Sequence, residues 1–383
     1  TWFLTGVYDE TDEVSQHFAT EYYGAPEKSN SNYEALFDVY FKTLLPDTVI
    51  PSGMTWEEER EACRALKGSM LRQEVYADDA EYPGATPMQV QRARTPYTVT
   101  EQNYTIRALQ KRGANRHAVF FTHAREAITY HYERNPADPR MQHALTLEVD
   151  AFGNVLKQAA IGYGRRASPL AEQWDRDRQT TALLTFTENR VTNTITTPDT
   201  HRSPLPCETI TYELTGYTRT GTAGRYQASD FVAPDPAAPG RLRHRFTSPE
   251  VAYEATATGS ERRRPVEWLR TLYRRDDLIG LLPLGALQPL ALSDESYKLA
   301  FTPGLLAQVF QRPRPGQAAE PLLPEPPAVL SGQVGNRGGY LQSQMLRGDG
   351  RFAASDADDH WWIPSGRSFF SPNPADSAAT EST

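Results

Sequence analysis

The sequence of 383 residues lacks several features that mark well-defined classes of proteins. It contains no run of about 18 apolar residues, so we expect neither a transmembrane helix nor direct insertion into a membrane. The first residues, TWFLTGVYDETDEV, have neither the basic start nor the apolar stretch of a secretory signal, so export of this chain alone is not expected. Because the chain begins with Thr1 rather than Met, we expect it to be a piece of something longer, with native termini elsewhere.

Cysteine and excess positive charge are also scarce. Cys63 and Cys207 are the two cysteines, far apart and without CxxC spacing, so neither a disulfide framework nor a cysteine zinc site is predicted. We expect two reduced thiols. The 40 basic and 48 acidic side chains give a net charge of −8, without the basic excess of nucleic-acid-binding proteins. Nucleic acid is therefore not expected as a main partner.

Common catalytic motifs are missing as well. The sequence has no GxSxG elbow, no Walker A loop, no GxGxxG after a strand and no HExxH pair. Glu57, Glu58 and Glu59 resemble paired catalytic glutamates, but at the start of a predicted helix the helix macrodipole explains them better. A hydrolase or an ADP-ribosyltransferase would need an acid/base or nucleophile set that we do not find. We predict no enzyme, no catalytic residue and no cofactor.

Two clusters of side chains are weak candidates for a metal site. Asp356, Asp358 and Asp359 have oxygen-rich spacing that can bind calcium, but the glycine and the downstream glutamate of an EF-hand loop are absent. A solvated acidic turn is the alternative. His117, His123 and His131 have even spacings, so within one strand they would share a face and could bind zinc. Turn signals between them argue against one uninterrupted strand, and we predict no metal site.

One helix is predicted with some detail. The composition, with 29 Pro, 25 Gly and 19 Tyr, favours turns and strands over long helices. The best helical signal covers residues 55–67, where Thr55 can cap the start, the three glutamates suit the first turn and Gly68 can end the helix. A strand is expected to follow over residues 71–77.

The rest of the chain predicts a mainly β protein. Branched and aromatic residues alternate with polar ones over 97–109, 117–123, 127–134, 143–150 and 154–164, and further strands are expected at 182–191, 192–197, 208–217 and 251–258. Residues 147–165 predict a hairpin, with Gly153 and Asn154 in its turn. We expect a large curved antiparallel sheet of such hairpins with a few short helices. Pro-rich loops are predicted at 232–240 and 312–329, and a disordered tail at 372–383.

Several long stretches resemble the shell-forming region of TcB, the Rhs-repeat component of bacterial insecticidal toxin complexes (Tc toxins). They include TWFLTGVYDE at Thr1, EACRALKGSMLRQEVYADD at Glu61, the segment from Pro96 to Arg166, RTLYRRDDLIGLLPLGALQPLALSDESYKLAFTPGLLAQVF at Arg270, and WWIPSGRSFFSPN at Trp361. Together with shorter stretches they touch most of residues 1–373. The departures from the family lie in two loops, at 312–329 and 346–360. The loop at 346–360 contains Asp356, Asp358 and Asp359, so its departure from the family weakens the calcium hypothesis.

The resemblance implies a role in toxin delivery. In this family TcB and its TcC partner form a hollow cocoon of strand-turn-strand (Rhs, or YD) repeats, which encloses a self-cleaved, variable C-terminal toxin supplied by TcC. The cocoon docks on a pentameric TcA pore through a β-propeller of TcB. This chain resembles only the portion after the propeller, so contact with TcA would be indirect. The aspartates of the TcC protease have no counterparts in this sequence.

We therefore expect residues 1–371 to be a non-catalytic shell segment. It would be folded in the bacterial cytoplasm and released within a secreted toxin complex. The alternative is a carbohydrate- or receptor-binding β module, which six Trp and 19 Tyr also suit. Burial of Trp2, Trp174, Trp268, Trp361 and Trp362 would remove the basis of that alternative, because glycan binding needs exposed rings.

Overall fold

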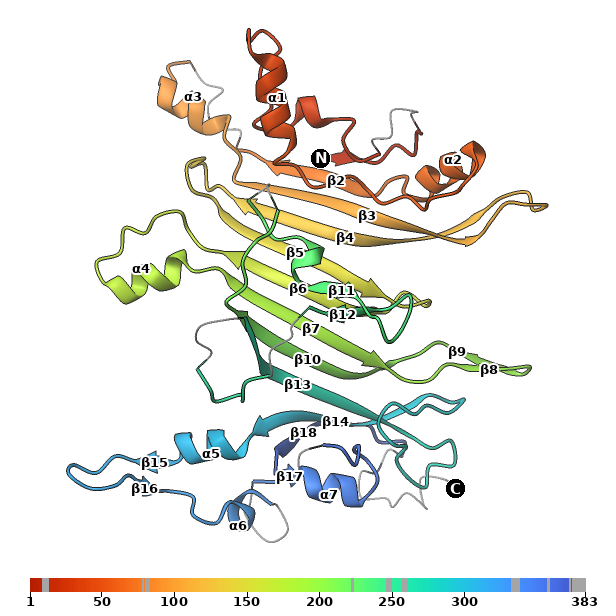
Figure 1. The fold of residues 1–383 in the computed structure, drawn as a ribbon, viewed down its shortest axis with the longest axis vertical. Coiled ribbons are helices and arrows are strands. Elements are labelled where there is room, and N and C mark those ends of the chain that lie inside the picture. The colour runs from red at the N-terminus through yellow and green to blue at the C-terminus, as the bar shows by residue number, and fades with distance from the viewer. Residues whose placement is uncertain are drawn as a thin grey trace. The chain divides into compact units, whose positions relative to one another are not determined.

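One large sheet dominates the described part of the chain (Figure 1). A computed structural model describes residues 1–8, 14–77, 79, 83–221, 224–245, 250–256, 261–331, 338–356, 359–371 and 373. Twelve strands pair in the order β1-β2-β3-β4-β5-β6-β7-β10-β13-β14-β18-β17. Their bounds are β1 Trp2–Phe3, β2 Met70–Val75, β3 Thr98–Gln110, β4 Val119–His131, β5 Arg140–Val149, β6 Val155–Tyr163, β7 Leu183–Val191, β10 Pro206–Thr215, β13 Arg262–Arg274, β14 Leu292–Phe301, β17 Leu341–Gln342 and β18 Trp361–Arg367.

The predicted fold class is confirmed. The protein is mainly β, with a twelve-stranded antiparallel sheet and few helices. Strands that follow one another along the chain are mostly neighbours in the sheet, as short connections between antiparallel strands favour. The described helices are α1 Tyr33–Phe41, α2 Trp56–Ala65, α3 Pro87–Ala93, α4 Gln173–Thr180, α5 Pro303–Val309, α6 Pro326–Leu330 and α7 Ser343–Gly348, with 3₁₀ turns η1 Ala19–Glu21 and η2 Ala228–Asp230.

The chain divides into two compact units. Unit 1 comprises Thr1–Leu147, Gln158–Leu184 and Thr218–Arg245, and unit 2 comprises Glu148–Lys157, Thr185–Tyr217 and Phe246–Thr383. The extent of the shell segment, residues 1–371, stays a prediction. No helix in the described ranges combines the length and the apolar character that crossing a membrane requires.

Helix α2 of unit 1 confirms the helix predicted over 55–67. The Oγ1 atom of Thr55 accepts a bond from the Glu58 amide and the Glu58 carboxylate accepts one from the Thr55 amide, so a capping box closes the start. The helix ends at Ala65, and Leu66 is its C-cap. Gly68 follows with a φ of +85°, a left-handed conformation that glycine adopts at little cost and that turns the chain away from the helix.

The apolar side of α2 packs on one face of the unit 1 sheet. Ala62, Cys63 and Leu66 are buried, and they form a core cluster with Leu71 of β2 and Ile106 of β3. Burial of such aliphatic side chains stabilises the fold by roughly 1.5–3 kcal/mol for each large one. Strand β2, predicted at 71–77, spans Met70–Val75 and carries Leu71 into this cluster.

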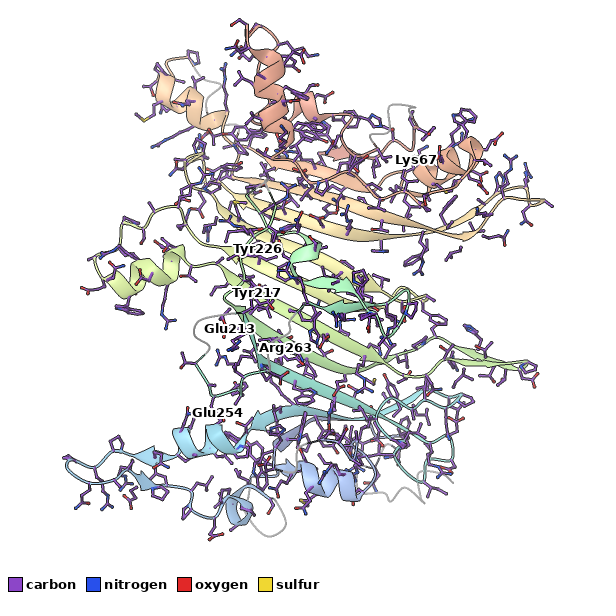
Figure 2. All side chains as sticks on the ribbon, viewed as in Figure 1. Lys67, Glu213, Tyr217, Tyr226, Glu254 and Arg263 are labelled. Atoms are coloured by element: carbon purple, nitrogen blue, oxygen red, sulfur yellow. The ribbon has the colours of Figure 1, made fainter. Side chains whose placement is uncertain are left out.

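The core of unit 2 is built around aromatic rings and one arginine. Trp362 of β18 is buried and packs with Trp268 and Phe352. The guanidinium of Arg270 lies over all three rings, at 4.4–4.9 Å from their centroids. Arg263 of β13, labelled in Figure 2, forms ion pairs with Glu188 at 3.4 Å and Glu250 at 3.3 Å. Burial raises the pKa of both carboxyl groups above the usual range, while Arg263 opposes the shift.

The hairpin turn predicted within 147–165 is confirmed between β5 and β6. One oxygen of the Asp150 carboxylate accepts bonds from the amides of Phe152 and Asn154, and the other accepts one from the Asn154 side chain. Gly153 has a φ of +94°, which a side chain would oppose.

Two strand predictions are wrong. Residues 117–134 were expected to form two strands, but β4 is a single strand over Val119–His131. Asn103 pairs with Glu126 and Tyr104 pairs with Ala124, so Arg125 is an extra residue in a bulge. The extra residue in the bulge lets the strand continue through residues 124–126, where the prediction had left a gap between two strands. Residues 251–256 of the expected strand 251–258 form a turn instead, closed by the Ala255 amide on the Ala252 carbonyl; residues 257–258 lie outside the described ranges.

The two Pro-rich segments contain more regular structure than expected. Residues 232–234 of the first segment form β11 (Val232–Pro234), which pairs with β12 (Leu242–His244) just beyond that segment, and Val232 is buried. Within 312–329, β15 (Gln311–Arg312) pairs with β16 (Glu320–Pro321), and prolines at the start of α6 suit the first helical turn. Strands β8 (Ile195–Thr197) and β9 (Thr200–Arg202) form a further hairpin. Apart from Asn373, the predicted tail at 372–383 lies outside the described residues.

Two glycines near the end of β6 provide a stability test. A Cβ atom on Gly164 would lie 2.0 Å from the Thr180 carbonyl oxygen, whereas a Cβ atom on Gly162 would meet nothing within 4 Å. We expect Gly164→Ala to lower the free energy of unfolding by about 1–3 kcal/mol, because backbone atoms must move. Gly162→Ala is expected to change it by less than about 1 kcal/mol. Urea denaturation of the full chain checks both, and equal effects would contradict the predicted clash.

Candidate functional site

One face of the sheet in unit 1 carries buried polar side chains where apolar ones would be ordinary. Strand registers place directly opposite residues on the same face, so Arg72, Glu101, Asn103, Glu126 and His143 share it. All five are buried. We call this the polar face. Because buried polar groups need partners, each of these side chains must be satisfied by the chain that covers it.

Arg72 and Glu101 form the charged end of the polar face. The Arg72 guanidinium donates to Glu101 at 2.8 Å and to Glu74 at 2.7 Å, and it stacks on the ring of Tyr22 at 4.7 Å. The second Glu101 oxygen accepts from the Leu45 amide at 2.5 Å. Burial raises the pKa of the Glu101 carboxyl above its usual range, and the nearby Arg72 charge opposes that shift.

A chain of hydrogen bonds continues across β3, β4, β5 and β6. The Asn103 amide group donates to the Pro46 carbonyl at 2.7 Å, and its oxygen accepts from the Glu126 amide at 2.8 Å. Glu126 lies 3.3 Å from Nε2 of His143, and Nδ1 of His143 lies 3.1 Å from the Tyr163 hydroxyl. That hydroxyl accepts from the backbone amide of Tyr226, so its own proton is available to His143 Nδ1. The imidazole can then donate from Nε2 to Glu126.

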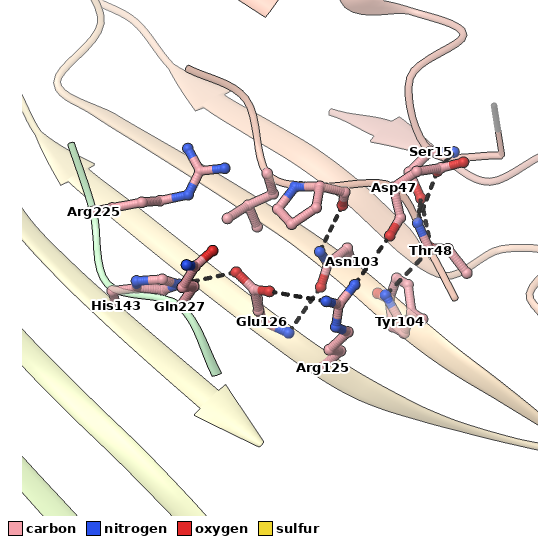
Figure 3. A network of polar contacts seen from close by, with 12 residues as sticks. Ser15, Asp47, Thr48, Asn103, Tyr104, Arg125, Glu126, His143, Arg225 and Gln227 are labelled. Atoms are coloured by element: carbon pink, nitrogen blue, oxygen red, sulfur yellow. Dashed lines mark hydrogen bonds and ion pairs between the residues drawn. The ribbon is translucent and has the colours of Figure 1, made fainter. Parts of the chain in front are cut away.

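Asp47 anchors the segment that crosses the polar face (Figure 3). Its carboxylate accepts from the amides of Val14, Ser15 and Thr48 at 2.6–2.9 Å, and its carbonyl oxygen accepts from Arg125 at 3.3 Å. The hydroxyl groups of Ser15 and Thr48 lie 2.5 Å apart. Residues 44–48 are thus held to the strands beneath them by side chains rather than by a strand ladder.

A cavity of about 670 Å³ adjoins the polar face within unit 1. Arg72 and Glu101 belong to both, and Tyr163, which contacts His143 of the polar face, also lines the cavity. Six tyrosines line it, namely Tyr23, Tyr40, Tyr130, Tyr132, Tyr163 and Tyr226 (the last is labelled in Figure 2). Burial raises the pKa of Tyr40, Tyr130 and Tyr163, the last to about 12, so these phenols stay protonated near neutral pH. The cavity therefore offers flat apolar walls of uncharged phenol rings.

The weak calcium candidates do not form a metal site in the described residues. Asp356 makes two bonds to Arg270, at 2.7 and 3.0 Å, and is therefore used in the core of unit 2. Asp359 lines a separate apolar groove beside Trp361, and Asp358 lies outside the described residues. No group of three or more His, Cys, Asp or Glu side chains that could hold a metal ion occurs in the described ranges.

The three histidines of the zinc hypothesis lie apart. Nδ1 of His117 is 2.7 Å from Glu61, whose pKa this contact lowers. His123 and His131 do share strand β4, contrary to our expectation, but the bulge at Arg125 lies between them. His123 pairs with Thr105 of β3, and His131 pairs with Thr98. Thr98 and Thr105 are seven residues apart, an odd number, so they point to opposite faces of the sheet. The two imidazoles therefore lie on opposite faces as well.

The glutamates of α2 and the cysteines have structural contacts. Glu58 belongs to the capping box and also accepts from the Arg112 amide, and these backbone bonds lower the pKa of its carboxyl group. Glu59 accepts from the Tyr8 hydroxyl at 2.5 Å. Cys63 and Cys207 are buried and free, and burial raises the pKa of each thiol to about 11. Such thiols are protonated and unreactive at neutral pH.

Most of the five named tryptophans are used in packing. Trp361 and Trp362 are 3% and 1% exposed. Trp2 and Trp268 are half-buried, and their indole nitrogens donate to Glu21 and Glu208. Trp174 is 61% exposed, but it stands alone on α4 beside Arg178. Four of the five tryptophans named for the carbohydrate-binding alternative are therefore used in packing or in hydrogen bonds, which weakens that alternative.

Sequence reasoning missed the polar face and the cavity. A partial signal was present, because Val99, Glu101 and Asn103 alternate along one face of a predicted strand and two of them are polar. Asp47 and Arg225 lie in irregular segments, so no periodicity could have connected them to β3 or β4. Only the tertiary fold brings them there.

The buried Glu101 carboxyl predicts a pH-dependent stability. A carboxyl whose pKa is higher in the folded state stabilises the fold below its unfolded pKa of about 4.3, and this contribution is lost as the pH rises through the folded pKa. The quantity to follow is the unfolding free energy of the wild type minus that of Glu101→Gln. This difference should fall as the pH rises from 4 to 7, by at most about 1.4 kcal/mol per pH unit.

Urea denaturation at a series of pH values measures this difference. The exposed Glu27→Gln is the matched control, and its difference should stay flat across the series. A wild-type advantage at Glu101 that grows with pH would instead mean that attraction to Arg72 outweighs the burial of the charge.

Comparison with known proteins relates this architecture to one toxin family. Residues 61–203 match the family model for the insecticide toxin TcdB middle/C-terminal region. A search of curated proteins gave no match. Among solved structures, the TcdB2–TccC3 complex aligns with 97% of this chain at 20% identity and a TM-score of 0.58, and the same complex without its hypervariable C-terminal region aligns with 97% at 21% identity and 0.57.

The Photorhabdus luminescens Tc holotoxin pore, carrying the TccC3 mutation D651A, aligns with 85% of the chain at 22% identity and a TM-score of 0.51. Our chain spans only a small part of each of these proteins. It covers 16% of the TcdB2–TccC3 chain, 15% of the chain without the hypervariable region and 13% of the holotoxin chain. At these identities the likeness shows the fold, and the matches together confirm that this chain resembles the TcB component of Tc toxins.

Proposed function

We propose that the chain is a non-catalytic shell segment of a TcB-type subunit. With a TcC-type Rhs partner it would enclose a cytotoxic C-terminal polypeptide, and the complex would deliver that cargo through a TcA pore. Contact with TcA would be indirect, through a β-propeller outside this chain. The observation that carries the proposal is the single antiparallel sheet, which aligns over 97% of the chain with a TcdB2–TccC3 complex.

The physical properties of such a sheet suit an enclosing wall. Each inner strand satisfies its backbone groups on both neighbours, so twelve strands can cover a wide area without buried unpaired amides. The polar face supports this role, because its side chains hold the covering segment in place. Glu101, which accepts from the Leu45 amide, and Asn103, which donates to the Pro46 carbonyl, are examples. We propose that the subunit folds in the bacterial cytoplasm and is released as part of the toxin complex.

Protection of the cargo from protease tests the proposal. The full-length subunit is co-expressed with a TcC-type partner, and the purified complex is treated with trypsin. We expect the C-terminal polypeptide to survive in the complex and to be degraded when the complex is denatured. Equal degradation in the intact complex would contradict encapsulation, provided that an exposed tag on the same complex is cleaved as a positive control.

A pair of variants at Thr209 connects the test to this chain. Thr209 of β10 pairs with Leu269 of β13, inside the sheet. Proline there removes a backbone donor, so Thr209→Pro should open the wall and lose protection of the cargo. Thr209→Val keeps a β-branched residue and removes only the bond to Asn189 at 2.8 Å, so protection should remain. Assembled Thr209→Pro complexes with full protection would contradict a wall built from β10.

A further inference from the structure

The cavity of unit 1 is positively charged in a chain that is negative overall. Its lining includes the five arginines Arg72, Arg165, Arg166, Arg219 and Arg225, and its acidic groups are Glu101 and Asp138. The lining therefore carries three positive charges in excess, whereas the whole chain carries a net charge of −8. A concentration of one sign in a concave surface attracts ligands of the opposite sign.

Four of these arginines have no carboxylate partner among the described residues. Arg72 is paired with Glu74 and Glu101. The others donate to backbone carbonyl oxygens: Arg165 to Asp138, Arg166 to Ala137, Arg219 to Gly224, and Arg225 to Thr43 at 2.8 Å and Leu44 at 2.6 Å. A carbonyl oxygen orients a guanidinium but leaves its charge in place. These contacts position cations around the cavity without neutralising them.

The arginines are also accessible to different degrees. Arg166 and Arg219 are exposed, and Arg165 and Arg225 are half-buried. A ligand can therefore meet two guanidinium groups near solvent and two more that are less exposed. A guanidinium fork matches the planar oxygen pair of a carboxylate and can bind it through two parallel hydrogen bonds.

We propose that this cavity binds an acidic polypeptide segment, one that carries several carboxylates. This inference rests on the proposed function, which supplies a polypeptide cargo beside the shell. The four guanidinium groups without a carboxylate partner among the described residues come from two separate stretches of chain, after β6 and after β10, so a ligand with several separated charges can engage more of them than a single small anion can.

The size and walls of the cavity favour a peptide over inorganic phosphate. At about 670 Å³ it falls within the roughly 300–1,000 Å³ of sites that bury drug-sized ligands. The six tyrosines provide apolar ring surface for a backbone and its side chains. A lone phosphate would leave most of this surface without a contact.

Binding of a labelled hexaglutamate peptide to the full-length protein tests the inference. Fluorescence anisotropy at low ionic strength should show saturable binding that weakens as salt is added. The double variant Arg166→Gln/Arg219→Gln should weaken it about tenfold, the combined effect of two exposed ion pairs. Both arginines are exposed, so we expect the variant to fold.

A matched control removes the same charge elsewhere in unit 1. Arg92→Gln/Arg178→Gln also deletes two exposed arginines, neither of which lines the cavity, and should leave the affinity within about twofold. Equal weakening by the two double variants would mean nonspecific attraction and would overturn the inference. Absence of peptide binding, or displacement of the peptide by an equal concentration of inorganic phosphate, would overturn it as well.

The protease test separates this inference from the proposed function. If the peptide does not bind while the cargo stays protected, the shell proposal stands and the cavity inference fails. If the peptide binds as expected and the cargo is degraded in the intact complex, the cavity is an acidic-peptide site and encapsulation fails.

Discussion

Pairing of buried charge on the polar face is the constraint on which unit 1 depends. Residues 44–48 cross this face as irregular chain, so their backbone groups have no strand partner there and must be satisfied by side chains. Glu101 accepts from the Leu45 amide, and Asn103 donates to the Pro46 carbonyl. Glu101 in turn needs a cation, which Arg72 supplies. An apolar face would bury more carbon, but it would leave the covering segment with unpaired amides.

Features that depend on neighbours in sequence were predicted well. The helix cap at Thr55, the alternation of β3 and the hairpin turn at Gly153 and Asn154 each arise within a few residues, and the structure confirms them. The errors arise where distant contacts override local pattern. A bulge at Arg125 keeps β4 continuous because β3 continues beside it, and residues 251–256 remain a turn despite their β-branched and aromatic composition.

The candidate site was beyond reach of the sequence for the same reason. Its cations come from β2 and from residues 165–166 and 219–225, its carboxylates from Glu101 and Asp138, and its tyrosines from six separate positions. No spacing rule connects such residues. By contrast, the metal candidates were chosen by spacing along the chain, and the fold uses Asp356 to pair with Arg270 and places His123 and His131 on opposite faces. Proximity in sequence is a weak guide to a site in a sheet, because neighbouring residues point to opposite sides.

A shell that must release its cargo needs contacts that are local and weak. The chain carries a net charge of −8, so an acidic segment of the proposed cargo would be repelled by the average charge of the chain and attracted where guanidinium groups gather. Exposed pairs of guanidinium and carboxylate are each worth about 0–1 kcal/mol and are screened by salt. Several of them can orient a polypeptide without trapping it, whereas a large apolar patch would bind an unfolded chain through a contact that salt does not weaken. In the proposed shell, charge gathered in one cavity would therefore allow a cargo to be held and still be released.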